Sequence, residues 1–391
     1  LVLKLIMLKF LEHPKYPCLG PHLRLLEFTG LWHPVASPAA RWKLILFYVT
    51  TLFFFSQYIK CIIFFNTDSL KLILQYVPFH MGIVKSCFFQ KNYASWSQLI
   101  EYTAKIERHQ KDQKSIEHLI KNYIKRSRSI TYFFWALAFF SNFSIFSEPY
   151  RKNYDTENAT RTYLYIFDGY TPFSRVPPGY YCSMVVQTVL GHIVSAYVVG
   201  WDTCVVSLMI FFTGQLKIFQ VYSKKIICAR SCINSRRNIV KCHRFYLKLI
   251  KFYFRCHKLF NSLISPVMFI YLIVISVNLG VCIIQIVELQ GNVGAIISSC
   301  LYVAACLIQL LLFYWHSNQV TEESLLVSRS SFESNWVDAD NNIQREVALL
   351  AATTNRRLLF KAGPFHEMSL STFVSILRTS YSFFTLLNET M

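Results

Sequence analysis

The sequence lacks the short motifs that mark the common enzyme and nucleotide-binding classes. Its 391 residues contain no Gly-rich phosphate loop, no HExxH zinc signature and no GxSxG nucleophile turn. Each of these motifs holds a reactive or phosphate-binding group in a fixed local geometry, so the sequence offers no catalytic constellation. Asp202 and His192 lie on one predicted helix, where a structural role explains the pair better than catalysis. We therefore expect a protein that is not an enzyme.

Zinc-binding spacing is also missing, although the chain has twelve cysteines. No CxxC pair occurs, which argues against a structural zinc site. Many of the cysteines fall inside apolar runs, where a thiol behaves as a small hydrophobic side chain. One basic segment does combine cysteines with histidines: Cys228, Cys232, Cys242, His243, Cys256 and His257. We interpret its cysteines as reduced cytosolic thiols and expect neither a metal nor a cofactor.

Acidic residues are scarce, with 21 Asp and Glu against 40 Lys and Arg, so the formal net charge is +19. The chain is 53% hydrophobic and 16% aromatic, and its mean hydropathy is +0.33. These values and the long apolar runs predict an all-α polytopic membrane protein. The basic residues lie in blocks between apolar runs, which is typical of cytoplasmic loops and not of a nucleic-acid-binding surface.

Seven apolar spans each approach the roughly 20 residues that a bilayer-spanning helix needs. They are residues 42–65, 69–90, 130–147, 179–201, 259–286, 293–315 and 369–387. Seven crossings place the two termini on opposite sides of the membrane. The sequence therefore predicts seven transmembrane helices.

The charges between the spans predict the orientation. Segment 91–129 is rich in Lys and Arg, and segment 217–258 is strongly basic with no Asp or Glu. The alternate connections, 148–178 and 287–292, have no such excess. Because basic loops stay in the cytosol, we expect a cytoplasmic N-terminus and an extracellular C-terminus. The sequon at Asn158 lies in a predicted extracellular connection and is a candidate glycosylation site.

The predicted cytoplasmic connections have helical patterning. Apolar residues recur at helical spacing among the charges of 91–129, and the fourth span continues past Trp201 without a break. We infer helices that project beyond the membrane and pack together. The expected organisation has four parts. Residues 1–41 form a cytoplasmic N-terminus, and residues 42–315 form a six-span unit with cytoplasmic extensions 91–129 and 217–258. Residues 316–368 form a cytoplasmic segment, and residues 369–391 form the seventh helix with an extracellular C-terminus.

The seventh span has two different faces when its residues are placed at 100° intervals. One face is mostly apolar. The other face carries hydroxyls and charged groups, and a charge such as that of Arg378 is costly in hydrocarbon. The residues of this face are Ser371, Ser375, Arg378, Ser382, Thr385, Leu386 and Glu389. Two interpretations remain open from this pattern. The polar face is either a packing face whose hydroxyls bond to their own helix, or the wall of a water-filled path enclosed by several copies.

The closing stretch RRLLFKAGPFHEMSLSTFVSILRTSYSFFTLL resembles the C-terminal signature of insect odorant receptors. The matching features are an Ala-Gly turn at Ala362, a Ser-Leu-x-x-Phe run from Ser369, and the Ser-Tyr-Ser run at Ser380. Upstream, HSNQVTEESLLVSRSSFESNWVD resembles the stretch that precedes the final helices in that family. The chain departs from the usual family pattern at Ser331-Phe332 and at Asn388-Glu389.

The resemblance implies a tuning subunit of an odorant-gated, non-selective cation channel in the plasma membrane of olfactory sensory neurons. Such subunits form tetramers with an olfactory co-receptor, and their cytoplasmic helix ends form an anchor domain. The resemblance implies that the seventh helices line the pore, here with Ser375, Arg378, Ser382, Leu386 and Thr390. A gustatory-type receptor channel is the alternative within the superfamily, and the Ser-Tyr-Ser-Phe-Phe ending disfavours it. A G-protein-coupled receptor would need the opposite orientation.

A volatile odorant needs a mainly aromatic and apolar pocket with few polar groups. The outer halves of the second to fifth spans offer such side chains at helical spacing. Our candidate ligand contacts are Tyr76, Phe79, His80, Ile83, Phe139, Asn142, Phe143, Met184, Gln187 and Asn278. Aromatic stripes of this kind also serve as core in a membrane bundle, so this choice is a prediction for the structure to locate.

The predicted orientation can be tested with epitope tags. A C-terminal tag should be stained on intact cells, and an N-terminal tag only after permeabilisation, because the basic connections hold the even-numbered loops in the cytosol. Asn158→Gln should also abolish a glycosidase-sensitive shift on a gel. A C-terminal tag that is reached only after permeabilisation would refute this orientation.

Overall fold

The computed structural model describes residues 11–35, 37–64, 73, 76–111, 113–150, 163–167, 169–174, 176–227, 231–263, 293–362 and 366–390. These residues are almost entirely helical. The helices are α1 Gly20–Phe28, α2 Pro38–Ile63, α4 Val77–Lys91, α5 Tyr93–Gln110, α6 Glu117–Phe146, α8 Gly179–Lys224, α9 Cys232–Leu263, α11 Val293–Phe332, α12 Asn341–Thr354 and α13 Leu370–Thr390. Two short antiparallel strands, β1 Lys361–Ala362 and β2 His366–Glu367, precede α13.

The expected all-α membrane architecture is confirmed. Among the described helices, α2, α6, α8 and α11 are long and apolar enough to cross a bilayer. Helices α4 and α13 occupy the predicted second and seventh spans. Most of the predicted fifth span, 259–286, lies outside the described residues, as does the start of the second. The predicted glycosylation site Asn158 also lies outside them.

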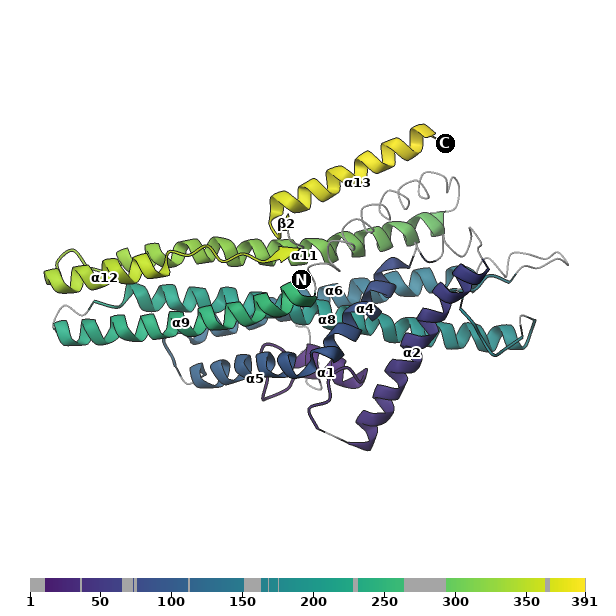
Figure 1. Cartoon of the computed structure of the whole chain (residues 1–391), viewed down its shortest axis with the longest axis horizontal. Helices are drawn as coiled ribbons and strands as arrows, with labels where there is room; N and C mark the ends of the chain where they lie inside the picture. Colours follow the sequence, from purple (N-terminus) through teal and green to yellow (C-terminus); the bar gives the residue numbers. More distant parts are fainter. Residues whose placement is uncertain are drawn as a thin grey trace.

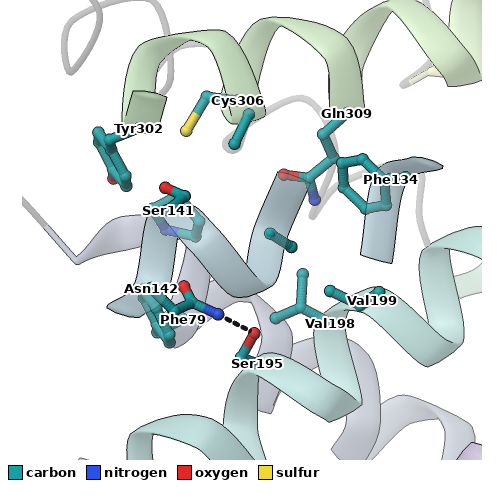
Figure 2. A pocket seen from close by; sticks show the side chains of 13 residues that line it. Phe79, Phe134, Ser141, Asn142, Ser195, Val198, Val199, Tyr302, Cys306 and Gln309 are labelled. Atoms are coloured by element: carbon teal, nitrogen blue, oxygen red, sulfur yellow. Dashed lines mark hydrogen bonds between the residues drawn. The ribbon is translucent and has the colours of Figure 1, made fainter. Parts of the chain in front are cut away.

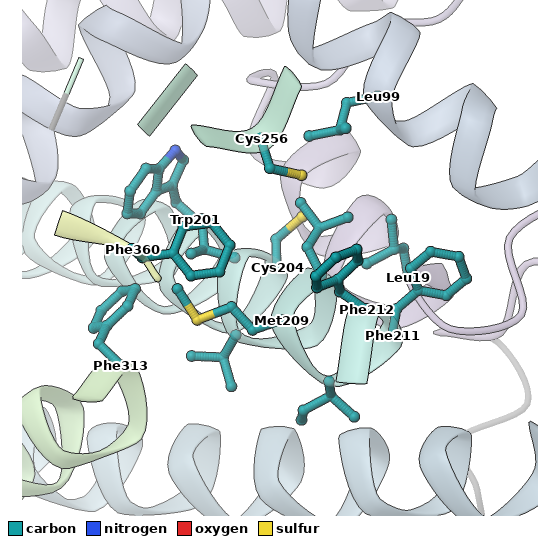
Figure 3. Close-up of a cluster of buried hydrophobic side chains, with 14 of the residues drawn as sticks. Leu19, Leu99, Trp201, Cys204, Met209, Phe211, Phe212, Cys256, Phe313 and Phe360 are labelled. Carbon is teal, nitrogen blue, oxygen red and sulfur yellow. The ribbon is translucent and has the colours of Figure 1, made fainter. Parts of the chain in front are cut away.

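Helix α8 is the central element, and it runs along the longest axis of the molecule (Figure 1). It contacts α11, α6, α4, α1 and α9. Every residue from Tyr197 to Leu216 is buried. Figure 3 shows side chains of this stretch enclosed by apolar residues from other segments, among them Leu19, Cys256 and Phe360. An all-round apolar sequence is what a helix without a solvent face requires.

The sequence accounts for where several helices begin and continue. Pro38 occupies the first turn of α2, and Ser37 caps it by accepting a hydrogen bond from the Ala40 amide at 3.1 Å. Helix α11 extends to Phe332, well beyond the end predicted for the sixth span at residue 315. The stretch after Trp315 contains no Gly or Pro, so no residue interrupts the helical backbone there.

At one end of the molecule α9 and α12 pack beside the C-terminal halves of α8 and α11, and we call this group the helical base (Figure 1). The buried face of α9 is aromatic, with Phe252 stacked on Phe212 at 5.6 Å between ring centroids. The opposite face of α9 carries exposed basic side chains: Arg237, Lys241, Arg244, Lys248, Lys251, Arg255 and Lys258. The predicted packing of helical extensions is therefore present, and its apolar side faces inward.

The segment before α1 is held in place by buried polar groups of α5 and α6. The Arg128 guanidinium donates to the Cys18 carbonyl at 2.6 Å, and Glu107 accepts from the Cys18 amide at 3.1 Å and from the Tyr123 hydroxyl at 2.9 Å. Burial raises the pKa of Glu107 to about 7. On α1, burial lowers the pKa of His22 to about 3. The N-terminal segment is thus an integral part of the fold.

An ion pair is buried between α4 and α8. The Lys85 ammonium lies 2.8 Å from Oδ1 of Asp202, and the two side chains are only 4% and 3% exposed. The rings of Trp201 and Phe313 lie 5.2 and 5.6 Å from the ammonium. Because Phe313 belongs to α11, this cluster links three helices. Breaking one partner of a buried pair leaves an uncompensated charge.

Removing one charge of this pair should reduce the amount of folded protein. Lys85→Met or Asp202→Leu alone should each cost about 3–5 kcal/mol, because the remaining charge would be buried without a partner. The double variant Lys85→Met/Asp202→Leu should recover most of the loss. The measurement is surface yield together with the monodisperse fraction after detergent extraction. A single variant with wild-type yield would show that the pair does not stabilise the fold.

Candidate functional site

A small cavity lies between α4, α6, α8 and α11 (Figure 2). Its volume is about 50 Å³. Its lining residues are Pro78, Phe79, Phe134, Ala138, Ser141, Asn142, Ser195, Val198, Val199, Tyr302, Ala305, Cys306 and Gln309. The lining contains aromatic and aliphatic groups, a few uncharged polar groups, and no charged side chain.

Helical periodicity brings the lining together. Helix α6 contributes residues 134, 138, 141 and 142, spaced i, i+4, i+7, i+8, and α8 contributes 195, 198 and 199, spaced i, i+3, i+4. Helix α11 contributes four residues with spacing i, i+3, i+4, i+7, from Tyr302 to Gln309. Each of these three helices therefore presents one continuous stripe to the cavity.

Two amides are the main polar groups of the lining. The Asn142 amide donates to the Ser195 hydroxyl across the α6–α8 contact (Figure 2). The Gln309 amide donates to Oδ2 of Asp202, the carboxylate that also pairs with Lys85. The cavity therefore adjoins the buried ion pair, and Gln309 belongs to both.

Of the residues predicted to contact a ligand, Phe79 and Asn142 line this cavity. The other predicted contacts of α4 and α8 are buried but do not line it. Several of them surround Phe167: Tyr76 lies 5.0 Å from its ring, and Gln187 accepts from its backbone amide at 3.0 Å. These residues form a core beside the cavity. They comprise Tyr76, His80, Ile83, Met184 and Gln187.

Phe139 and Phe143 lie on the outer face of α6 and are 56% and 64% exposed. Both are next in sequence to a lining residue, so the helical turn carries them away from the cavity. Asn278 lies outside the described residues. The spacing of aromatic and polar residues predicted all three as ligand contacts, and neither Phe139 nor Phe143 lines the cavity.

Helix α11 contributes lining residues that were not among the predicted ligand contacts. They include Tyr302, Cys306 and Gln309. A signal did exist, because Gln309 is an amide within an apolar run, and an uncharged polar group in hydrocarbon needs a partner. Its partner, Asp202, lies on another helix, and only the fold brings the two together.

The predicted pore residues lie on α13, which contacts α11 and then diverges from it (Figure 1). Its apolar face packs inward, with Ile376 and Ser380 buried and the Phe373 ring 6.3 Å from that of Tyr314. The opposite face is exposed and includes Ser375, Arg378 and Ser382. The Ser375 and Ser382 hydroxyls donate to carbonyls of their own helix at 3.1 and 3.0 Å.

The side chains of Leu386 and Thr390 lie outside what the structure describes. The hydroxyls of the exposed face therefore have local partners, as the packing interpretation expects. The face itself nevertheless has no partner helix within the described chain, since its residues are exposed.

The family model described as "7tm Odorant receptor" matches residues 67–381. Odorant receptor 10 of Aedes albopictus is 26% identical over 219 residues, which are 54% of this chain and 56% of the relative. Odorant receptor Or2 of Anopheles gambiae is 27% identical over 150 residues, 38% of each chain. The matched regions thus span about half the length of these curated relatives or less.

The fold is similar to a solved structure, that of the insect olfactory receptor OR5 from Machilis hrabei in complex with eugenol. The TM-score is 0.75 with 15% identity, over 95% of this chain and 98% of that one. At this identity the likeness concerns the fold. The family model, by contrast, covers well over half of the sequence and includes the helices that carry the cavity. This chain belongs to the insect odorant receptor family.

Proposed function

We propose that this chain is the tuning subunit of an odorant-gated, non-selective cation channel, with its ligand site in the cavity between α4, α6, α8 and α11. The observation that carries the proposal is the placement of this cavity against α11, the helix that also contacts α13. One helix therefore touches both the proposed ligand site and the proposed pore helix. Membership of the odorant receptor family supports the same function.

The chemistry of the cavity suits a small volatile ligand. The lining is mainly apolar, it lacks a charged side chain, and it is formed by four helices of the bundle. Apolar pockets with few placed polar groups bind small neutral molecules and exclude ions. The related OR5 receptor was solved with eugenol, which is a molecule of this kind.

Helix α11 provides a short route from the cavity to the pore helix. Gln309 lines the cavity, and Tyr314 lies five residues further along the same helix, about 8 Å by helical rise. The Tyr314 ring contacts Phe373 of α13. A ligand that shifts or rotates α11 would therefore change the α11–α13 contact, and differential contacts of that kind are what gating requires.

The exposed face of α13 supports assembly into a multi-subunit channel. Arg378 is costly in hydrocarbon, and within the described chain its face is uncovered. Several subunits around a symmetry axis would enclose a water-filled path lined by these faces. We assign the partners as olfactory co-receptor subunits in a tetramer within the lipid of the plasma membrane of olfactory sensory neurons. In this arrangement the helical base is the cytoplasmic anchor.

Odorant responses should depend on the co-receptor. Cells that express this chain with an olfactory co-receptor should give robust currents to an odorant panel, whereas this chain alone should give little or none. The helical base and α13 need partner subunits to close the pore. The co-receptor alone is the matched control. Robust odorant currents from this chain alone would show that no co-receptor is required.

Changes in the cavity and in the pore helix should have separable effects. Phe79→Ala should shift the EC50 or the rank order of odorants without changing single-channel conductance, because Phe79 lines the cavity. Leu386→Ser should raise the leak current, because a polar side chain weakens an apolar constriction. The two effects should be close to independent, since the two substitutions lie on different helices, α4 and α13.

Phe139→Ala is the control for the cavity, since it removes an exposed ring from the neighbouring helix α6. It should leave odorant potency unchanged. All variants are compared in complexes with the co-receptor at matched surface expression. Wild-type conductance and leak in Leu386→Ser would contradict the pore-lining role of this face, and the hydroxyls of α13 would then belong to helix packing.

A further inference from the structure

The cavity has one polar group whose orientation is fixed by a charge outside the lining. Gln309 donates its side-chain amide to Oδ2 of Asp202, and Oδ1 of Asp202 lies 2.8 Å from the Lys85 ammonium. Asp202 is 2% exposed and Lys85 5% exposed, so neither reaches water. The three residues come from α11, α8 and α4, and form a buried chain that ends at the cavity.

Chemistry determines which end of the Gln309 amide faces Asp202. An ionised carboxylate has only acceptor atoms, so the NH₂ group of Gln309 must point toward it and the carbonyl oxygen must point away. A flipped amide would place two acceptors together in a medium of low dielectric constant, which is costly. Both oxygens of Asp202 act as acceptors, since Oδ1 accepts from the Lys85 ammonium at 2.8 Å and Oδ2 accepts from the Gln309 amide.

The carbonyl oxygen of Gln309 consequently faces the cavity, as Figure 2 shows. The Asn142 amide has a similar arrangement, because its NH₂ group is directed to the Ser195 hydroxyl and leaves its carbonyl oxygen on the other side (Figure 2). Both amides of the lining therefore direct an N–H to the protein and keep the carbonyl oxygen on the other side. These carbonyl oxygens are hydrogen-bond acceptors for a ligand.

We propose that this cavity selects volatile ligands that carry a hydrogen-bond donor, namely alcohols or phenols, and that Gln309 determines this specificity. The ligand hydroxyl donates to Oε1 of Gln309, while Asp202 and Lys85 act as positioning residues that hold the amide in its orientation. The inference rests on the proposed odorant-receptor function and names the ligand class of the same site.

The discrimination follows from the cost of unpaired polar groups. A ketone, ester or ether of the same shape brings only acceptors, so it leaves the Gln309 oxygen without a partner and places a second oxygen beside it. A site built to bond a ligand hydroxyl discriminates strongly against the analogue that lacks it. An aldehyde or ketone should therefore be a weaker agonist than the corresponding alcohol.

The test uses matched ligand pairs on the full chain co-expressed with the co-receptor. The probes are 2-alkanols against 2-alkanones of equal chain length, and phenol against anisole. The alcohol or phenol of each active pair should have an EC50 about two- to tenfold lower, the factor expected from one hydrogen bond. This comparison needs no variant, so it does not depend on the folding of a mutant.

Variants then assign the effect to the residue. Gln309→Met keeps the side-chain length but removes the acceptor, so the alcohol should lose its potency advantage while the ketone is unchanged, and the EC50 ratio should approach one. Val199→Ala is the matched control on the same lining. It enlarges the cavity without touching an acceptor, so it should shift both members of a pair together and leave their ratio intact.

Asp202→Asn addresses the positioning role. An asparagine can donate as well as accept, so the Gln309 amide is free to flip and offer its NH₂ group to a ketone. The EC50 ratio should fall because the ketone gains potency, a change that a merely structural defect would not produce. Surface yield is measured alongside, and Gln309→Met carries the test if Asp202→Asn does not reach the membrane.

The outcomes separate the two proposals. Agonists drawn only from ketones, esters and ethers, or equal EC50 values within pairs, would overturn the donor selectivity while leaving an odorant-gated channel. A Gln309→Met variant that keeps the wild-type ratio would overturn the role of Gln309. If no volatile of either class opens the co-expressed channel at verified surface expression, the proposed function fails, and the ligand assignment fails with it.

Discussion

Every residue of α8 from Tyr197 to Leu216 is buried, so the middle of this helix has no face left for lipid or water. Five other helices must therefore cover it, and α1, α4, α6, α9 and α11 do so. The close packing around α8 also requires glycine at positions where two helices approach each other. A Cβ on Gly82 would meet the Val198 side chain at 2.1 Å, and one on Gly214 would meet the Tyr123 ring at 2.6 Å. The packing of the protomer is organised around this one enclosed helix.

An enclosed helix that carries polar side chains must find them partners among its neighbours. Asp202 pairs with Lys85 and accepts from Gln309. Thirteen residues further along α8, Gln215 exchanges two amide hydrogen bonds with Gln110 of α5, at 2.8 and 2.9 Å. An unpaired buried polar group costs far more than a satisfied one gains, so these contacts fix the register of the helices on α8. Register is what places the cavity lining.

The same logic connects the cavity to the exposed helix α13. Helix α11 takes part in both regions, since Gln309 lines the cavity and Tyr314 packs against Phe373 of α13. Among the described residues, α13 buries Ile376 and Ser380 and makes the ring contact with α11, while its opposite face stays uncovered. A loosely attached helix beside a tightly packed core is suited to move while the ligand site keeps its shape. The proposed gating follows from this difference in burial.

Hydropathy by itself determined the all-α membrane class, the positions of α2, α6, α8, α11 and α13, and the unbroken course of α8, because a bilayer span is a local property of about 20 residues. The C-terminal pattern from Ala362 to Ser382 indicated the family, because a motif is likewise a local property of the sequence. Periodicity also separated the two faces of α13, whose buried Ile376 and exposed Arg378 lie where the pattern put them.

What the sequence did not determine is which face of each aromatic helix turns inward. Phe139 and Phe143 point outward while Asn142 lines the cavity, and Gln309 gains its role from Asp202, a residue 107 positions away. Only the tertiary structure decided these points, because they depend on neighbours that come from distant segments of the chain.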